Sequence, residues 1–157
     1  MKTKFHRILV PVDFSPCAYE AYRAAVTLAR EFRGELLVLH VIDTRILESL
    51  TEASRLKADV LIEALHKKAK LRFRSLISKY PSRVKVQQII ADGIPFQEIV
   101  KISRSKRVDL IVIGRYGGTE ELEKIFFGST AEKVVRLAPC AVLSIPLIKS
   151  VPRRSVS

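Results

Sequence analysis

Apolar residues along the chain form short continuous runs separated by longer stretches with helical spacing. Short apolar runs bounded by turn signals are typical of buried strands. Five such runs cover residues 7–13, 35–43, 83–92, 110–113 and 140–146. The stretches between them repeat apolar residues every three or four positions. They predict helices at residues 16–32, 45–80, 95–106 and 129–138. This strict alternation predicts an α/β protein of one domain, with a parallel sheet covered by helices on both faces.

Three features set the expected helix boundaries. Residues 45–80 contain no glycine or proline until Pro81, so we expect one long helix there, with a loose first part. The first helix has Ser15 as a plausible cap and Pro16 just inside it. Gly34 follows the first helix and is expected to end it as a left-handed residue.

Ligands of open parallel sheets bind beyond the carboxyl ends of the strands, where the strand order reverses. Asp13, the segment 41–43 and Gly114 all come at such strand ends. We therefore expect a ligand at this edge of the sheet, although the sequence alone leaves open which two strands flank it.

The stretch from Asp109 to Ala131 carries the strongest chemical signal. A buried strand is followed by three glycines, Gly114, Gly117 and Gly118, and later by a helix that starts at Gly128-Ser129-Thr130. Glycine permits close approach of a ligand, and a helix start offers free N–H groups to phosphate. An ordinary strand-to-helix connection with a glycine turn and a hydroxyl cap would have the same residues, so both interpretations stay open.

The net charge of the chain favours negatively charged partners, including those that carry phosphate. The chain has 28 Lys and Arg against 16 Asp and Glu, a net charge of +12, which favours nucleotides, nucleic acids or acidic proteins. Basic segments such as residues 101–107 lack an aromatic platform or a recognition helix, so a solvated basic face explains them more simply than nucleic-acid binding.

Other classes of function find little support. Cys17 and Cys140 form neither a disulfide framework nor a zinc motif, and the histidines lack metal-ligand spacing. His40 is expected to be a satisfied core or edge histidine. Nucleophile-elbow, zinc-protease and Walker motifs are absent, so we expect a binding protein rather than an enzyme. No apolar run is long enough to span a membrane, and we expect a cytoplasmic protein.

Several segments together resemble the universal stress protein family over roughly residues 4–148. They are the opening ILVPVDFSPCAYEA, the strand ending LHVID, the strand DLIVIG and the segment GSTAEKVVRLAPCAVLSIP. The resemblance implies a Rossmann-like sheet of five strands in the order 3-2-1-4-5, as in adenine nucleotide alpha hydrolases. A domain at residues 1–148 would then be followed by a basic, mobile tail at residues 149–157. Asp13 and Gly114 would lie together at the switch point.

One branch of that family binds ATP through the motif G-x2-G-x9-G-[ST]. Here Gly114 and Gly117 supply the first pair, but ten residues separate Gly117 from Gly128, and counting from Gly118 restores nine. The chain thus looks like the ATP-binding branch with one inserted residue. The resemblance implies base contacts from Pro11, Asp13 and Val41. Ribose and phosphates would be surrounded by Gly114, Arg115, Gly117 or Gly118, Gly128, Ser129 and Thr130.

The expected function is therefore that of a stress-response module that binds ATP, ADP or AMP with Mg²⁺. We expect the N–H groups of Gly128, Ser129 and Thr130 to point at the phosphates. The alternative is a family member that binds no nucleotide and acts through contacts with other proteins. The resemblance also implies a homodimer formed by antiparallel pairing of the last strand, residues 140–146, because this apolar strand would otherwise be an open edge.

Overall fold

The computed structural model describes residues 4–117 and 127–147 of the chain. Residues 118–126 of the glycine loop, which include Gly118, and the predicted basic tail at residues 149–157 lie outside these residues. The strands are β1 (Arg7–Pro11), β2 (Glu35–Asp43), β3 (Val86–Gly93), β4 (Leu110–Gly114) and β5 (Ala141–Ile145). The helices are α1 (Pro16–Phe32), α2 (Thr44–Ser54), α3 (Ala58–Lys79), α4 (Pro95–Ser105) and α5 (Ser129–Leu137).

The described strands form one five-stranded sheet in the order β3-β2-β1-β4-β5. All four pairings are parallel, as the alternation of strands and helices predicts, and the order that the resemblance implies is confirmed. The central strand β1 therefore lies between β2 and β4, and chain connections leave it on both sides. The switch point of the sheet is at the carboxyl ends of β1 and β4.

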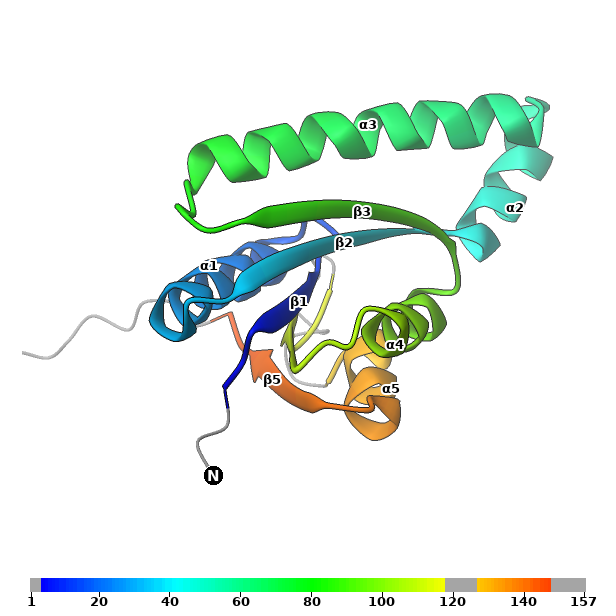
Figure 1. Cartoon of the computed structure of the whole chain (residues 1–157). Helices are drawn as coiled ribbons and strands as arrows, with labels where there is room; N and C mark the ends of the chain where they lie inside the picture. Colours follow the sequence, from blue (N-terminus) through cyan, green and yellow to red (C-terminus); the bar gives the residue numbers. More distant parts are fainter. Residues whose placement is uncertain (1–3, 118–126, 148–157) are drawn as a thin grey trace, which may run out of the picture.

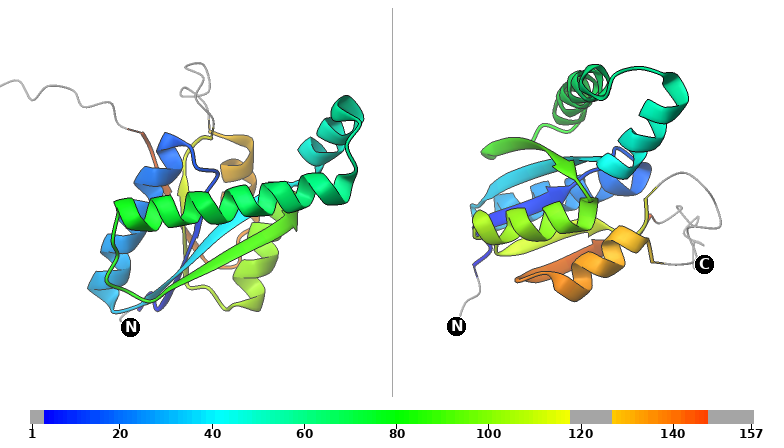
Figure 2. Two further views of the ribbon diagram at one scale, coloured as in Figure 1. Left: turned by 90° about the horizontal axis from the view of Figure 1, so that it is seen from above. Right: turned by 90° about the vertical axis from the view of Figure 1, so that its right-hand side faces the viewer.

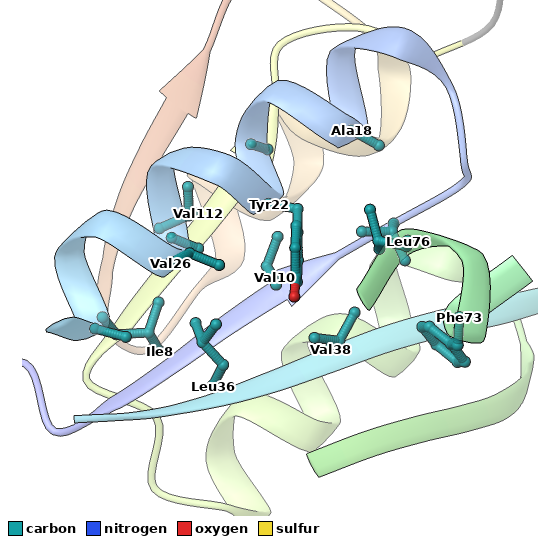
Figure 3. Close-up of a cluster of buried hydrophobic side chains, with 14 of the residues drawn as sticks. Ile8, Val10, Ala18, Tyr22, Val26, Leu36, Val38, Phe73, Leu76 and Val112 are labelled. Carbon is teal, nitrogen blue, oxygen red and sulfur yellow. The ribbon is translucent and has the colours of Figure 1, made fainter. Parts of the chain in front are cut away.

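Helices cover both faces of the sheet (Figure 1). On one face, α1 and α3 pack on the sheet through a core that includes Tyr22 and Phe73, both fully buried (Figure 3). On the other face, α4 and α5 contribute Ile99 and Val134 to a second core. Burial of large apolar side chains is worth about 1.5–3 kcal/mol each, so these two cores hold the strand ends in place for the site.

The first helix begins as its sequence predicts but ends differently. Ser15 is the N-cap, and its side chain accepts a hydrogen bond from the Ala18 N–H, with Pro16 in the first turn. At the other end, the left-handed residue is Arg33, with φ of 52°, so the prediction that Gly34 adopts this conformation is wrong. A Cβ at Gly34 would lie 2.7 Å from the carbonyl oxygens of Phe5 and His6. Gly34 is required by this close approach to the chain before β1.

The prediction of one long helix at residues 45–80 is also wrong. The region forms two helices, α2 and α3, because Arg55 adopts a left-handed conformation with φ of 57°. The left-handed conformation costs an ordinary residue about 1 kcal/mol or more and carries no glycine or proline signal here. As a result α2 and the start of α3 extend past the carboxyl ends of β2 and β3 (Figures 1 and 2).

Candidate functional site

The site begins where β1 and β4 stop pairing. Their register ends at Leu9 and Ile111, whereas β1 stays paired with β2 as far as Pro11. The Val12 N–H donates to the Leu39 carbonyl of β2, at an N···O distance of 2.7 Å. Alternate residues of a strand direct their N–H groups to opposite sides, so Pro11 has its nitrogen on the β4 side. Since proline has no N–H to donate, it cannot extend the ladder there, and the strands diverge.

A cavity of about 1070 Å³ occupies this carboxyl edge of the sheet. Its walls come from the ends of β1, β2 and β4, the starts of α1 and α5, and parts of α2, α3 and α4. Eight predicted site residues line it: Pro11, Asp13, Val41, Gly114, Gly117, Gly128, Ser129 and Thr130. The topology thus brings together residues that are up to 119 positions apart, from Pro11 to Thr130.

The two other predicted site residues are placed differently. Gly118 lies outside the described residues. Arg115 is not part of the cavity wall, and its guanidinium carbon lies 5.8 Å from the centre of the Phe127 ring. The backbone of Arg115 holds the loop in place, because its N–H donates to the Ile145 carbonyl at 2.8 Å. Its position therefore favours a role in shaping the loop.

The glycines of the loop allow neighbouring chain segments to approach closely. A Cβ at Gly114 would lie 3.1 Å from both the carbonyl carbon and the Sγ of Cys17, so this glycine lets α1 pack on the end of β4. A Cβ at Gly117 would lie 2.6 Å from Asp13 Oδ2. Asp13 and Gly117 therefore approach each other across the switch point. The other carboxylate oxygen of Asp13 accepts the Ser15 N–H at 2.9 Å.

Helix α5 starts at the cavity, but one of the N–H groups expected to bind phosphate already donates to another backbone carbonyl. The Gly128 N–H donates to the Arg115 carbonyl at 2.8 Å, so the prediction that it points at a phosphate is wrong. Ser129 and Thr130 occupy the first two helical positions, whose N–H groups have no partner within a helix. No side chain among the described residues caps this helix start. Together with the two hydroxyls, these N–H groups form an environment suited to an anion.

An aromatic pair that sequence reasoning missed lines the cavity beside Asp13. Phe14 has a positive φ of 63°, a conformation rare for a bulky residue and often found at functional sites. Its ring centre lies 4.8 Å from that of His40. The His40 Nδ1 lies 2.8 Å from the Val12 carbonyl, to which it must donate, so the expectation of a satisfied histidine is confirmed. Burial lowers the pKa of His40 and keeps the ring neutral near pH 7.

The wall formed by α2 and α3 was also missed by sequence reasoning. It brings Ile46, Leu50 and Leu65 to the cavity, with Lys68 and Arg72 one helical turn apart. Residues 65, 68, 69 and 72 follow helical spacing on one face. This spacing is a signal in the sequence, but the same pattern also describes a helix that packs on the sheet and exposes its basic residues.

The described residues offer little else for chemistry. In residues 4–117 and 127–147, no three His, Cys, Asp or Glu side chains come together as metal ligands. Cys17 is buried, and its thiol donates to the Ile145 carbonyl. Within the same residues, no helix has the length and apolar character needed to cross a membrane. The arrangement is suited to binding an anionic ligand of considerable size.

These features define an open α/β protein with a large cavity at the switch point of a parallel sheet. The model of the universal stress protein family matches residues 4–146. Universal stress protein MJ0531 of Methanocaldococcus jannaschii is 32% identical over 142 residues, covering 90% of this chain and 82% of the relative. The chain belongs to the universal stress protein family.

Solved structures support the same assignment. The structure of protein MJ0577, also from M. jannaschii, has a TM-score of 0.79 and 33% sequence identity, covering 93% of this chain and 99% of the other. A universal stress protein of Archaeoglobus fulgidus in complex with dAMP has a TM-score of 0.61 and 26% identity. It covers 90% of this chain and 98% of the other.

Proposed function

We propose that this protein binds an adenine nucleotide in the cavity at the switch point and acts as a stress-response regulatory module rather than as an enzyme. The observation that carries the proposal is the gathering of Asp13, Gly117 and the start of α5 around one large cavity. The A. fulgidus relative bound to dAMP supports an adenine nucleotide as the ligand. The cytoplasmic location stays a prediction from the sequence.

In this proposal the phosphates lie at the start of α5. The N–H groups and hydroxyls of Ser129 and Thr130 bind them, aided by the partial positive charge of the helix start. Pro11 and Val41 face the base, and the Asp13 carboxylate accepts a hydrogen bond from the base or the ribose. Gly114, Gly117 and Gly128 let the surrounding backbone come close, and Arg115 and Gly118 belong to the same loop.

Magnesium fits this site only as a companion of the phosphates. Mg²⁺ prefers one or two carboxylates together with phosphates and water. Among the described residues, Asp13 places a carboxylate beside Gly117 of the glycine loop, and the hydroxyls of Ser129 and Thr130 are oxygen donors that line the same cavity. We therefore expect nucleotide binding to persist, although weakened, when Mg²⁺ is removed.

The decisive experiment is to look for the ligand directly. Mass spectrometry of the protein denatured straight after purification should detect a co-purifying adenine nucleotide. Thermal melting with ATP, ADP and AMP should then rank them. A ligand at 100 times its Kd stabilises the fold by about 2.7 kcal/mol, which raises the Tm of a domain of this size by about 5–10 °C.

The alternative is a family member that binds no nucleotide and acts through protein contacts. Under that alternative, millimolar Mg-ATP, Mg-ADP and AMP would all leave the melting curve unmoved, and no nucleotide would co-purify. The ten residues between Gly117 and Gly128, where the family's ATP-binding motif has nine, would then be the sequence difference that accounts for the missing nucleotide.

A further inference from the structure

The two ends of the cavity differ in chemistry. At the glycine-loop end, the described wall includes the aromatic residues Tyr116 and Phe127, the hydroxyls of the α5 start and the Asp13 carboxylate, with no lysine or arginine among its described residues. A different part of the wall comes from α3, which contributes Lys68 and Arg72; both are exposed, lie on the same side of the helix and line the cavity. The lysine and arginine of the described wall thus come from α3, which packs on the other face of the sheet from α5, where we place the 5′ phosphate.

These two cations have no carboxylate to neutralise them within the described residues. No ion pair found in residues 4–117 and 127–147 includes Lys68 or Arg72, whereas their neighbour Lys67 pairs with Glu63 at 3.2 Å. The cavity-lining Asp43 is paired with Arg45 and is not available to them. An anion placed between Lys68 and Arg72 would therefore meet two positive charges that no carboxylate of the described residues neutralises.

The surface around Lys68 and Arg72 also offers aromatic and apolar contacts, which suit an organic ligand better than a hydrated ion. The Arg72 guanidinium carbon lies 5.4 Å from the centre of the Phe14 ring, so the arginine stacks on an aromatic face of the cavity. Leu65 from the preceding turn of α3 and Ile46 of α2 add apolar wall. The total volume of about 1070 Å³ is slightly above the roughly 300–1,000 Å³ typical of small-molecule sites.

We propose that the cavity binds an adenine nucleotide that carries a second phosphate on its ribose. The 5′ phosphate lies at the start of α5, and the second phosphate is held by Lys68 and Arg72. This inference rests on the proposed function and specifies its ligand class. Lys68 acts as a mobile point charge, and Arg72 as a planar donor that can bind two phosphate oxygens at once.

Isothermal titration calorimetry on the full chain tests this with matched ligands. AMP is compared with adenosine 3′,5′-bisphosphate and adenosine 2′,5′-bisphosphate, which differ from AMP only by the second phosphate. We expect at least one bisphosphate to bind the wild type about tenfold or more tightly than AMP, as charge-assisted hydrogen bonds imply. The double variant Lys68→Gln/Arg72→Gln should lose that ratio.

A charge-matched control separates a site from general attraction. Because the chain carries +12, any more negative ligand is attracted more strongly. The variant Lys67→Gln/Lys70→Gln removes the same charge from the same helix. Lys67 and Lys70 do not belong to the described wall of the cavity, and Lys70 lines a separate groove with His66 and Arg74. This control should keep the bisphosphate preference.

The outcomes separate this proposal from the proposed function. Equal affinity of the wild type for AMP and both bisphosphates would overturn the second phosphate site while leaving nucleotide binding intact. A preference that survives in Lys68→Gln/Arg72→Gln, or that is lost equally in the control, would also overturn it. If neither AMP nor ATP binds the wild type, both proposals fail.

Discussion

The amide of Gly128 donates a 2.8 Å hydrogen bond to the carbonyl oxygen of Arg115, tying the start of α5 to the glycine loop. The two segments are in close contact, because a Cβ at Gly128 would lie 3.0 Å from the Tyr116 Cα and 3.3 Å from the Arg115 carbonyl oxygen. Gly128 has φ of −61°, which any residue can adopt. Gly128 is therefore required because there is no space for a side chain, and it positions the helix start at which we propose that the anion binds.

Substitution of Gly128 should consequently affect both stability and binding. We expect Gly128→Val to push the loop away from α5, to lower the free energy of unfolding by about 1–3 kcal/mol and to abolish the Tm shift caused by Mg-ATP. Gly128→Ala should do the same to a smaller extent. Thermal melting with and without ligand measures both effects.

Ser129→Ala is the matched control, because it removes a hydroxyl at the next position and keeps the backbone N–H. It should melt within about 0.5 kcal/mol of the wild type without ligand and bind nucleotide more weakly. A Gly128→Val protein that melts like the wild type in the absence of ligand would contradict the packing role.

Asp13 makes a structural contact in addition to the ligand contact that we propose, and two substitutions separate the two roles. Its Oδ1 accepts the Ser15 N–H, and asparagine can retain that acceptor whereas alanine cannot. We expect Asp13→Ala to lower the free energy of unfolding by about 0.5–1.5 kcal/mol and Asp13→Asn to lower it less. Both should weaken nucleotide binding, though less than Gly128→Val. Calorimetric titration of AMP into each variant measures this loss of affinity. If Asp13→Asn binds AMP as tightly as the wild type does, the carboxylate does not contact the ligand.

Much of the carboxyl edge can be predicted from the sequence, because the spacing of apolar residues and the succession of strands and helices are local signals. Apolar runs identify the strands, and Asp13 and Gly114 follow two of them directly, so their placement at one edge requires only a parallel sheet. Their adjacency additionally requires the strand order, which the family resemblance supplies. The structure agrees on both counts.

What the sequence does not predict depends on contacts between distant segments. Gly34 and Gly128 look like a helix terminator and a phosphate donor, but each is fixed by a backbone segment elsewhere in the chain. The break at Arg55 has no local signal, since an arginine adopts the left-handed conformation there. Without that break, α3 could not be placed, and Lys68 and Arg72 would be interpreted as ordinary exposed cations.

The edge strand β5 leads to a prediction about assembly. Leu143 is 39% exposed on this strand, and the open edge of an apolar strand favours pairing with a second copy. We expect the wild type to sediment at about twice its chain mass of 17.7 kDa, consistent with antiparallel pairing about a two-fold axis. Leu143→Lys should shift it toward the monomer.

Leu71→Lys is the control for this prediction, since Leu71 is 62% exposed on α3, which covers the sheet away from β5 (Figure 1). That variant should keep the wild-type mass. A wild-type protein that sediments near 17.7 kDa at micromolar concentration would rule out the dimer.

The basic surface near the end of α4 should not bind nucleic acid tightly. Lys101, Arg104, Lys106 and Arg107 are exposed, and phosphate contacts from such residues weaken steeply with salt. We expect weak binding to duplex DNA at low salt that is lost at physiological ionic strength, measured by fluorescence anisotropy. A Kd on the order of 10⁻⁸ M or tighter in that salt would instead favour a nucleic-acid partner.

His40 should make stability depend on pH in a defined direction. Burial lowers its folded pKa below the ordinary value of 6.5, the Val12 hydrogen bond and the Asp13 charge oppose this, and Arg72 and His66 reinforce it. The unfolded chain therefore takes up a proton at a higher pH than the folded protein does. Stability is unaffected by this group above about pH 7 and falls as pH drops below 6.5, until the folded pKa is reached.

His40→Gln isolates this contribution, because its amide can still donate to the Val12 carbonyl without gaining a proton. Urea unfolding of both proteins between pH 5 and pH 8 should show a constant difference in free energy of unfolding above pH 7. Below pH 6.5 the wild type should lose stability relative to the variant. A wild type that instead gains stability relative to His40→Gln on acidification would mean that the imidazolium is favoured in the fold. The neutral imidazole that we assign to His40, beside Phe14 and the Val12 carbonyl, would then be the wrong protonation state.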